Sequence, residues 1–118
     1  MTQLTDEDKR VRNILIDVAA KEETITASDL VVKANVPLNM TSPNDRKLLG
    51  RILGRIVEYE HESGRPMLSS VIVSKSKVRG DGFFKIAEQL GYGDWQTLKN
   101  DGFATKQMNE AYKFWKKH

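Results

Sequence analysis

One stretch, residues 42–82, carries the clearest folding signals in this chain of 118 residues. Ser42-Pro43 is typical of a helix N-terminus, because serine accepts a backbone N–H there and proline fits the first helical position. Apolar residues then return every three or four positions, and Gly64 stands where a helix commonly ends. These signals predict one long helix from Pro43 to about Ser63. Its apolar stripe consists of Leu48, Leu49, Ile52, Leu53, Ile56 and Val57.

A β-branched run, Val71-Ile72-Val73, follows this helix. Because such residues favour strands, we expect a short strand from Pro66 to Ser74. A basic loop, Lys75–Gly82, comes next, and its glycines permit a tight return of the chain. The strand and loop together predict a short β-hairpin.

Helical patterns flank the stretch on both sides. An amphipathic helix is predicted from a cap at Thr5 to about Lys21, and a short one begins after Thr26 and closes before Pro37. Downstream, we expect a helix from Phe83 to Leu90, a turn capped by Asp94, and a last helix from about Thr105. The predicted fold is therefore α+β and mostly helical, in a single domain, 1–118. It has a winged-helix-like core of three helices and a hairpin, residues 5–84, and a C-terminal helical extension, residues 85–118.

The net charge of +3 is unevenly distributed. Residues 44–79 carry eight Lys and Arg against four Asp and Glu, a net charge of +4, whereas residues 1–43 sum to −2. A local basic surface attracts phosphate even when the whole chain is nearly neutral. A solvated charged face is the alternative interpretation.

Helical spacing aligns basic residues on the N-terminal half of the long helix and Glu58 and Glu62 on its C-terminal half. In a winged helix-turn-helix the third helix enters the major groove, where Asn reads adenine and Arg or Lys reads guanine, and basic wing residues contact phosphates. The predicted nucleic-acid-binding residues are Asn44, Lys47, Arg51, Arg55, Lys75, Lys77 and Arg79. We expect duplex DNA as the partner.

Two glycines, Gly50 and Gly54, lie four residues apart beside the apolar stripe. Each costs about 1 kcal/mol of helix stability relative to alanine inside a helix. We therefore expect that the absence of a side chain at these positions serves a close contact. Close approach of a neighbouring backbone is the first interpretation. Close approach of a nucleic-acid backbone is the second.

From Ile25 to Phe83 the layout resembles the DNA-binding domain of the O6-alkylguanine alkyltransferases and alkyltransferase-like proteins. The shared features are a threonine-led short helix, a helix rich in Arg, Gly and Leu, then proline, a hydrophobic strand and a Gly-containing loop. The resemblance implies duplex DNA binding, with Arg51 or Arg55 in the place of an arginine that enters the duplex. That family accepts the alkyl group in a Pro-Cys-His-Arg-Val segment, where this chain has Leu68-Ser69-Ser70-Val71-Ile72. Because the chain has no cysteine, alkyl transfer is excluded.

The pattern Gly64-Arg65-Pro66-Met67-Leu68-Ser69 followed by Gly80-Asp81-Gly82-Phe83-Phe84 also resembles a set of short uncharacterised bacterial proteins. That similarity carries no known activity.

No catalytic or metal-binding arrangement stands out. Glu58 and His61 form one Glu-x-x-His pair, but di-metal helical bundles use that pair twice with further carboxylates. A solvated, charged helix end explains the segment Glu58–Glu62 better. Ser69 and Ser70 lack an evident base. We therefore expect a protein that is not an enzyme and that holds no cofactor or metal.

The leading functional hypothesis is non-enzymatic DNA binding through the basic helix face and the wing. The alternative is a protein-interaction module, such as a small bacterial or phage inhibitor or an accessory subunit. Its surface would include the Glu58–Glu62 run and the aromatic tail Tyr112–Trp115. No apolar run approaches the roughly 20 residues that cross a bilayer, and the polar, acidic N-terminus differs from a signal peptide. A cytoplasmic location is expected, while the oligomeric state and the target stay open.

Overall fold

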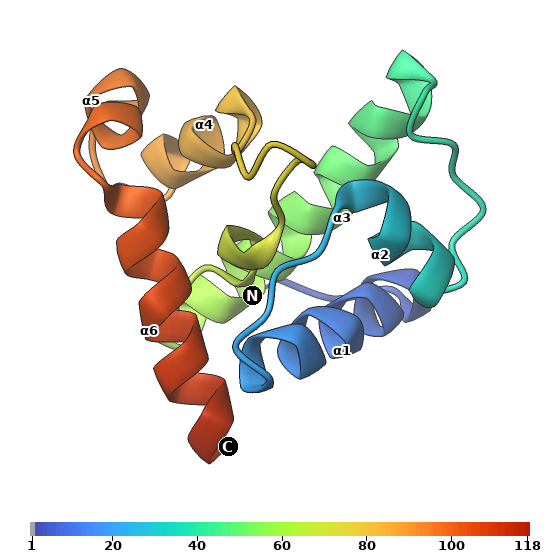
Figure 1. Ribbon diagram of the computed structural model, residues 1–118, viewed down its shortest axis with the longest axis horizontal. Coiled ribbons are helices and arrows are strands. Elements are labelled where there is room, and N and C mark those ends of the chain that lie inside the picture. The colour runs from blue at the N-terminus through green and yellow to red at the C-terminus, as the bar shows by residue number, and fades with distance from the viewer. Residues whose placement is uncertain (1) are drawn as a thin grey trace.

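The computed structural model describes residues 2–118, and among these it contains helices and turns but no β-strand. The elements are α1 (Asp6–Ala20), α2 (Ala27–Lys33), α3 (Pro43–Glu62), the 3-10 helix η1 (Leu68–Val71), α4 (Asp81–Gln89), α5 (Trp95–Asn100) and α6 (Phe103–Lys117) (Figure 1). The predicted α+β fold with a β-hairpin is therefore wrong. The described chain is all-helical.

The caps of the first three helices are confirmed. Thr5 Oγ1 accepts a hydrogen bond from Asp8 N at 3.1 Å, and Thr5 N donates to Asp8 Oδ2 at 3.0 Å. Ser42 caps α3 through Asp45 N at 3.3 Å, with Pro43 in the first helical position. These local side-chain bonds satisfy backbone N–H groups that a helix start leaves free.

The predicted strand, Pro66–Ser74, instead forms η1 and one isolated parallel bridge between Ile25 and Ile72. All four residues of η1 are buried, and η1 contacts α1, α3 and α6. A lone strand there would need partners for its backbone groups, whereas Ser70 Oγ bonds locally to Met67 O at 2.7 Å. Burial on several sides therefore overrides the β preference of the sequence.

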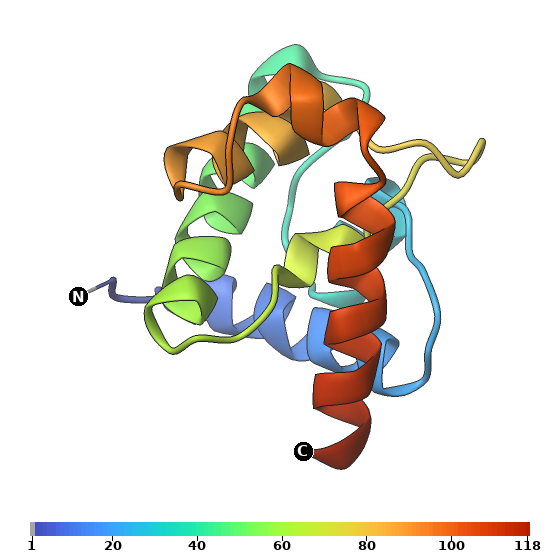
Figure 2. The ribbon, with the colours of Figure 1, turned by 90° about the vertical axis from the view of Figure 1, so that its left-hand side faces the viewer.

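Figures 1 and 2 show η1 enclosed by α1, α3 and α6. This first core takes its largest buried side chains from α1, α2, α3 and η1, and α6 adds Ala111. The main members are Val11, Leu15, Leu30, Ile52, Ile56, Leu68 and Val71. The predicted C-terminal extension thus includes a helix, α6, that packs against α1 and η1 and contributes Ala111 to the first core.

A second, smaller core joins α4, α5 and the start of α6 to Val57 and Met67. Phe84, Ala87 and Leu98 are its buried members from α4 and α5. It holds α4 beside α3, so that the two helices share a groove. Among residues 2–118, no helix combines the length and the apolar character needed to span a membrane. The cytoplasmic location stays a prediction.

Candidate functional site

Three of the seven predicted contact residues, Asn44, Lys47 and Arg51, lie exposed on the N-terminal half of α3. Among residues 2–118, none of the three takes part in a side-chain hydrogen bond or an ion pair. Their charges and polar groups are therefore free to meet a ligand.

Arg55, one turn further along α3, is occupied within the protein. Its Nε donates to Asp8 Oδ2 at 2.7 Å and its Nη2 donates to Asp8 Oδ1 at 2.9 Å, a bidentate pair. Asp8 is completely buried. Burial alone would raise the pKa of Asp8, but the hydrogen bonds from Arg55 and from the Thr5 backbone outweigh it, and the pKa is lowered. Arg55 thus joins α3 to α1.

The basic loop also divides into structural and free residues. Arg79 donates to the backbone oxygen of Ser70 from Nε at 2.9 Å and from Nη2 at 2.7 Å, and burial lowers its pKa. This side chain therefore ties the loop to η1. Lys75 is exposed, while Lys77 Nζ lies 3.4 Å from Thr24 Oγ1. Both lysines line a concavity of about 360 Å³ that Lys33 shares.

The exposed lysines of the loop do not line the same cavity as Arg51 of α3. Lys75 and Lys77 face the segment between α1 and α2, whereas Arg51 faces α4. In Figure 2 the loop projects to the right, while most of α3 lies to the left. The loop is a tight turn closed by Ser74 N donating to Val78 O at 2.8 Å, so no wing extends beside α3.

Gly50 and Gly54 lie in open surroundings. A Cβ atom built on either glycine would meet nothing within 4 Å. The interpretation that a neighbouring backbone of this chain approaches them is therefore wrong. What remains is a stretch of α3 where a ligand can approach the helix backbone closely.

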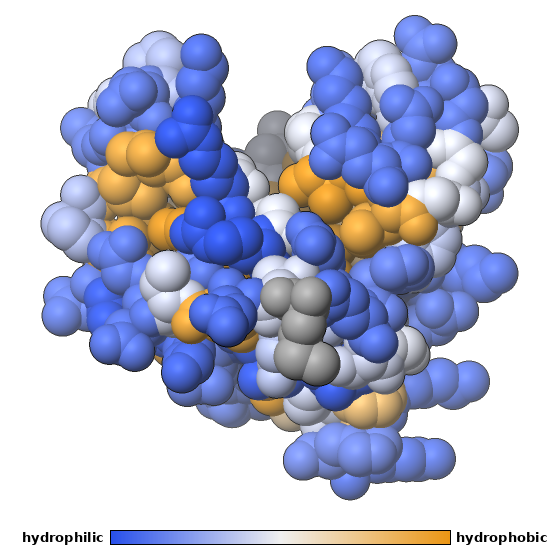
Figure 3. Space-filling model, turned by 180° about the vertical axis from the view of Figure 1, so that it is seen from behind, coloured by the Kyte–Doolittle hydropathy of each residue, from blue (hydrophilic) through white to orange (hydrophobic). Residues whose placement is uncertain are grey.

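The open side of α3 forms one wall of a groove whose other wall is α4. The groove has a volume of about 690 Å³. Its α3 wall consists of Arg51, Gly54, Arg55, Glu58, His61 and Glu62, and its α4 wall of Ile86, Gln89 and Leu90. Figure 3 shows the molecule from behind, hollowed between two lobes, with hydrophobic surface exposed beside the hollow. We call the groove between these two walls the α3–α4 groove.

The acidic segment Glu58–Glu62 is only partly the solvated helix end that we expected. Glu60 is fully buried and forms ion pairs with Arg12 and Arg65. Both guanidinium groups also lie over the ring of Tyr59, at 5.2 and 5.5 Å from its centroid. Glu58 stays exposed and unpaired among the described residues. No group of three metal-ligating side chains occurs within residues 2–118.

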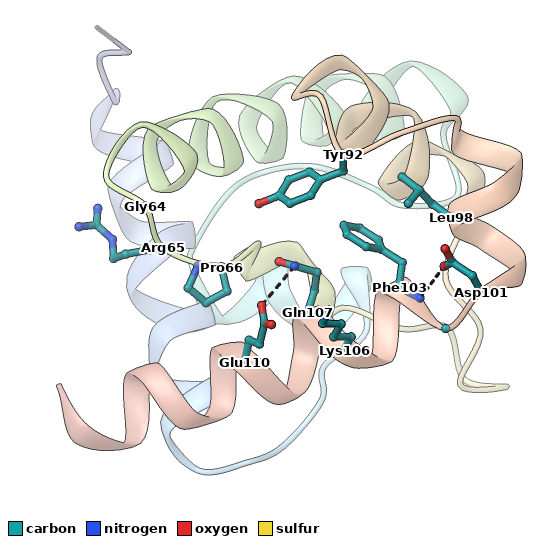
Figure 4. Close-up of a pocket in the computed structure, with 11 residues that line it drawn as sticks. Gly64, Arg65, Pro66, Tyr92, Leu98, Asp101, Phe103, Lys106, Gln107 and Glu110 are labelled. Carbon is teal, nitrogen blue, oxygen red and sulfur yellow. Dashed lines mark hydrogen bonds between the residues drawn. The ribbon is translucent and has the colours of Figure 1, made fainter.

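A third cavity, of about 680 Å³, lies between the end of α3, α5 and α6 (Figure 4). Several of its polar side chains, including Gln107 and Asp101, are hydrogen-bonded to the protein itself. Gln107 Oε1 accepts from Met67 N at 3.0 Å, and Gln107 Nε2 donates to Glu110 Oε2 at 3.3 Å. Asp101 Oδ1 accepts from Phe103 N at 3.1 Å. The bond to Met67, which precedes η1, attaches α6 to that segment, and the other two bonds are local to α6.

Comparison with known proteins finds no relative of this chain. The chain matches no protein-family model, no curated protein and no solved structure. The resemblance to the alkyltransferase family therefore stays a prediction, although the hydrophobic strand on which it partly rested is a 3-10 helix.

Sequence reasoning found Arg51 and the open glycines but missed the apolar wall. Ile86 was not singled out, and Leu90 was predicted only as the end of its helix. Both are partly buried, because one side of each packs on the second core and the other lines the groove. No signal in the sequence distinguishes such half-covered residues from fully buried ones.

Proposed function

We propose that the protein is a protein-interaction module that binds a helical segment of its partner in the α3–α4 groove. The observation that carries this proposal is the composition of the groove, with a charged wall from α3 opposite an apolar wall from α4. Grooves that receive amphipathic helices combine apolar contact with a polar rim. Duplex DNA offers no apolar stripe that would match Ile86 and Leu90.

The backbone of α3 favours the same occupant. Helices pack with their axes 8–10 Å apart, and the distance depends on the side chains at the contact. Gly54 presents no side chain there, and Gly50 lies one turn before it. A partner helix can therefore lie close against α3 while its apolar residues contact α4.

The charges along the groove determine the direction in which a partner helix can bind. Arg51 lies toward the N-terminal end of α3, and Glu58 and Glu62 lie toward the C-terminal end. Because opposite charges attract across an interface and like charges repel, only a partner with the reverse charge order fits well.

A site-specific cross-linking experiment tests this proposal. A photo-crosslinking amino acid replaces Gln89 on the groove wall, and in a matched control it replaces Gln96, which is exposed on α5 and lines none of the cavities described above. We expect a discrete protein adduct on irradiation of cells that carry the Gln89 version and none with the Gln96 version. The additional change Leu90→Glu should remove the adduct. Equal labelling at both positions, or no adduct at either, would overturn the proposal.

DNA binding is a second candidate, favoured by one observation: Asn44, Lys47 and Arg51 are exposed and unpaired among residues 2–118 at the N-terminal half of α3. The helix dipole also favours anions at that end. The double change Lys47→Ala and Arg51→Ala should weaken binding to duplex DNA and reduce its salt dependence. The control, Lys106→Ala with Lys113→Ala on α6, removes the same charge elsewhere. Absent or salt-independent binding by the unmodified protein excludes this candidate.

A further inference from the structure

Resting on the proposed function, we propose that the partner is a second copy of this chain. The two α3 helices lie antiparallel, each seated in the α3–α4 groove of the other. The association is isologous, so that the same surface is used on both copies.

The charge order of α3 carries this inference. Lys47, Arg51, Glu58 and Glu62 are exposed, and their spacings of four, seven and four residues keep them on one helix face. A two-fold axis between residues 54 and 55 places Arg51 opposite Glu58 of the second copy. The same axis places Lys47 opposite Glu62. Each copy thus presents the reverse charge order that the groove requires, and an antiparallel pair contains four complementary contacts.

The acidic members of this face form no ion pair within residues 2–118. Glu58 has no partner among the described residues. Glu62 accepts a hydrogen bond from the Thr2 backbone N–H at 2.9 Å, and this bond lowers the pKa of Glu62. Within residues 2–118, neither carboxylate is paired with a basic side chain, so both can face Lys47 and Arg51 of a second copy.

The centre of the proposed pair is the least obstructed part of α3. Gly54 lies next to the two-fold axis, and nothing lies within 4 Å of where its Cβ atom would be. The absence of a side chain lets the two helices approach at the crossing point. Ile86 and Leu90 flank the groove of each copy, so the symmetric pair covers the apolar wall twice.

Charge-reversal variants at Arg51 and Glu58 distinguish this antiparallel dimer from arrangements in which these two residues do not face each other. In an Arg51→Glu dimer, two glutamates face each other at each of the two equivalent contacts, and in a Glu58→Arg dimer two arginines do so. Mixing the two variants restores both contacts, because each contact then joins one acidic and one basic side chain across the two-fold axis. The double variant Arg51→Glu with Glu58→Arg restores them within a single sequence.

Sedimentation velocity across a concentration series tests the proposal with the purified full chain. We expect the unmodified protein to dimerise, each single variant to associate at least tenfold more weakly, and both the equimolar mixture and the double variant to recover most of the affinity. Raised salt should weaken the dimer, because it screens exposed charges. Circular dichroism checks that each variant is folded, which is expected because both positions are exposed.

Two results would overturn the inference: an unmodified protein that is monomeric at every concentration, or single variants that dimerise as well as it does. Failure of the mixture to recover affinity would also exclude the antiparallel register. If the chain is monomeric while the Gln89 cross-linker still captures a different protein, self-association is excluded. The proposed protein-interaction function is then retained, with that protein as the partner. If neither dimer nor adduct forms, both proposals fail.

Discussion

The two faces of α3 carry the same kinds of charged residue in opposite environments. Toward α1, Arg55 and Glu60 are paired with Asp8 and Arg12, respectively, across the helix interface. On the outer face, Arg51 and Glu58 have no partner within residues 2–118. The pairs Arg51/Arg55 and Glu58/Glu60 thus separate charges that hold the fold from charges that are free to bind.

The difference arises because α1 places an acidic side chain, Asp8, and a basic side chain, Arg12, against the inner face of α3. A buried charge is tolerated only when it is paired and hydrogen-bonded, and each inner-face charge meets that condition. The outer face meets water, where an unpaired charge costs little. Function is therefore to be sought among the unpaired charges, and stability among the paired ones.

The largest effect is expected at Glu60. Replacing Glu60 by Gln removes the negative charge between Arg12 and Arg65 and leaves two partly buried cations facing each other. Breaking a buried ion pair from one side costs about 3–5 kcal/mol, and we expect a loss of that order in the free energy of unfolding. Urea denaturation measures it.

Glu58→Gln is the matched control, because it makes the same chemical change two residues away on the outer face. At a protein concentration low enough to keep the chain monomeric, surface changes of this kind stay within about 0.5 kcal/mol. Equal losses for the two variants would show that the two faces do not differ in the way described.

A smaller effect is expected at Asp8. Its partner, Arg55, has a side chain that is 39% exposed, so solvent weakens the pair, and Asp8→Asn should cost about 2 kcal/mol. Since the folded-state pKa of Asp8 is lowered, its contribution is complete above the unfolded value of about 3.9. The contribution is lost as the pH falls from there through the lower folded pKa.

Unfolding free energies of the unmodified protein and of Asp8→Asn, measured from about pH 6 down to about pH 2.5, test this assignment because that range spans the acid titration of the carboxyl group. The gap between the two curves should close in the acid range. A gap that stays constant with pH would mean that the Asp8 charge does not contribute, and that only its cap geometry matters.

Local signals predicted the helices well, because each start depends on residues within four positions. Thr5, Thr26 and Ser42 all cap as expected. The segment Leu68–Val71 was mispredicted because its burial depends on α1 and α6, which lie far away in the sequence. The β preference of three residues carries no information about that enclosure.

The candidate site was predicted only in part for a related reason. Arg51 and Arg55 look alike in sequence, and the partner that distinguishes them, Asp8, is 47 residues from Arg55. Likewise, Glu60 resembles its exposed neighbours until Arg12 is brought against it. Helical periodicity identifies which residues share a face, but not which face receives an oppositely charged partner.

The smallest effect, at Gly54, tests the outer face most directly. Gly54→Ala should raise the stability of the monomer by about 1 kcal/mol, because alanine favours helix and a Cβ atom there meets nothing within 4 Å. The same methyl group should weaken self-association, since it lies at the proposed crossing point. Thermal unfolding at low protein concentration measures the stability of the monomer, and sedimentation measures self-association.

Gly64→Ala is the contrasting variant, because Gly64 has φ +72°, a conformation that alanine adopts at a cost of about 1 kcal/mol. If Gly54→Ala destabilises the monomer as Gly64→Ala does, the outer face of α3 is not open, and neither a partner helix nor DNA can approach it as described.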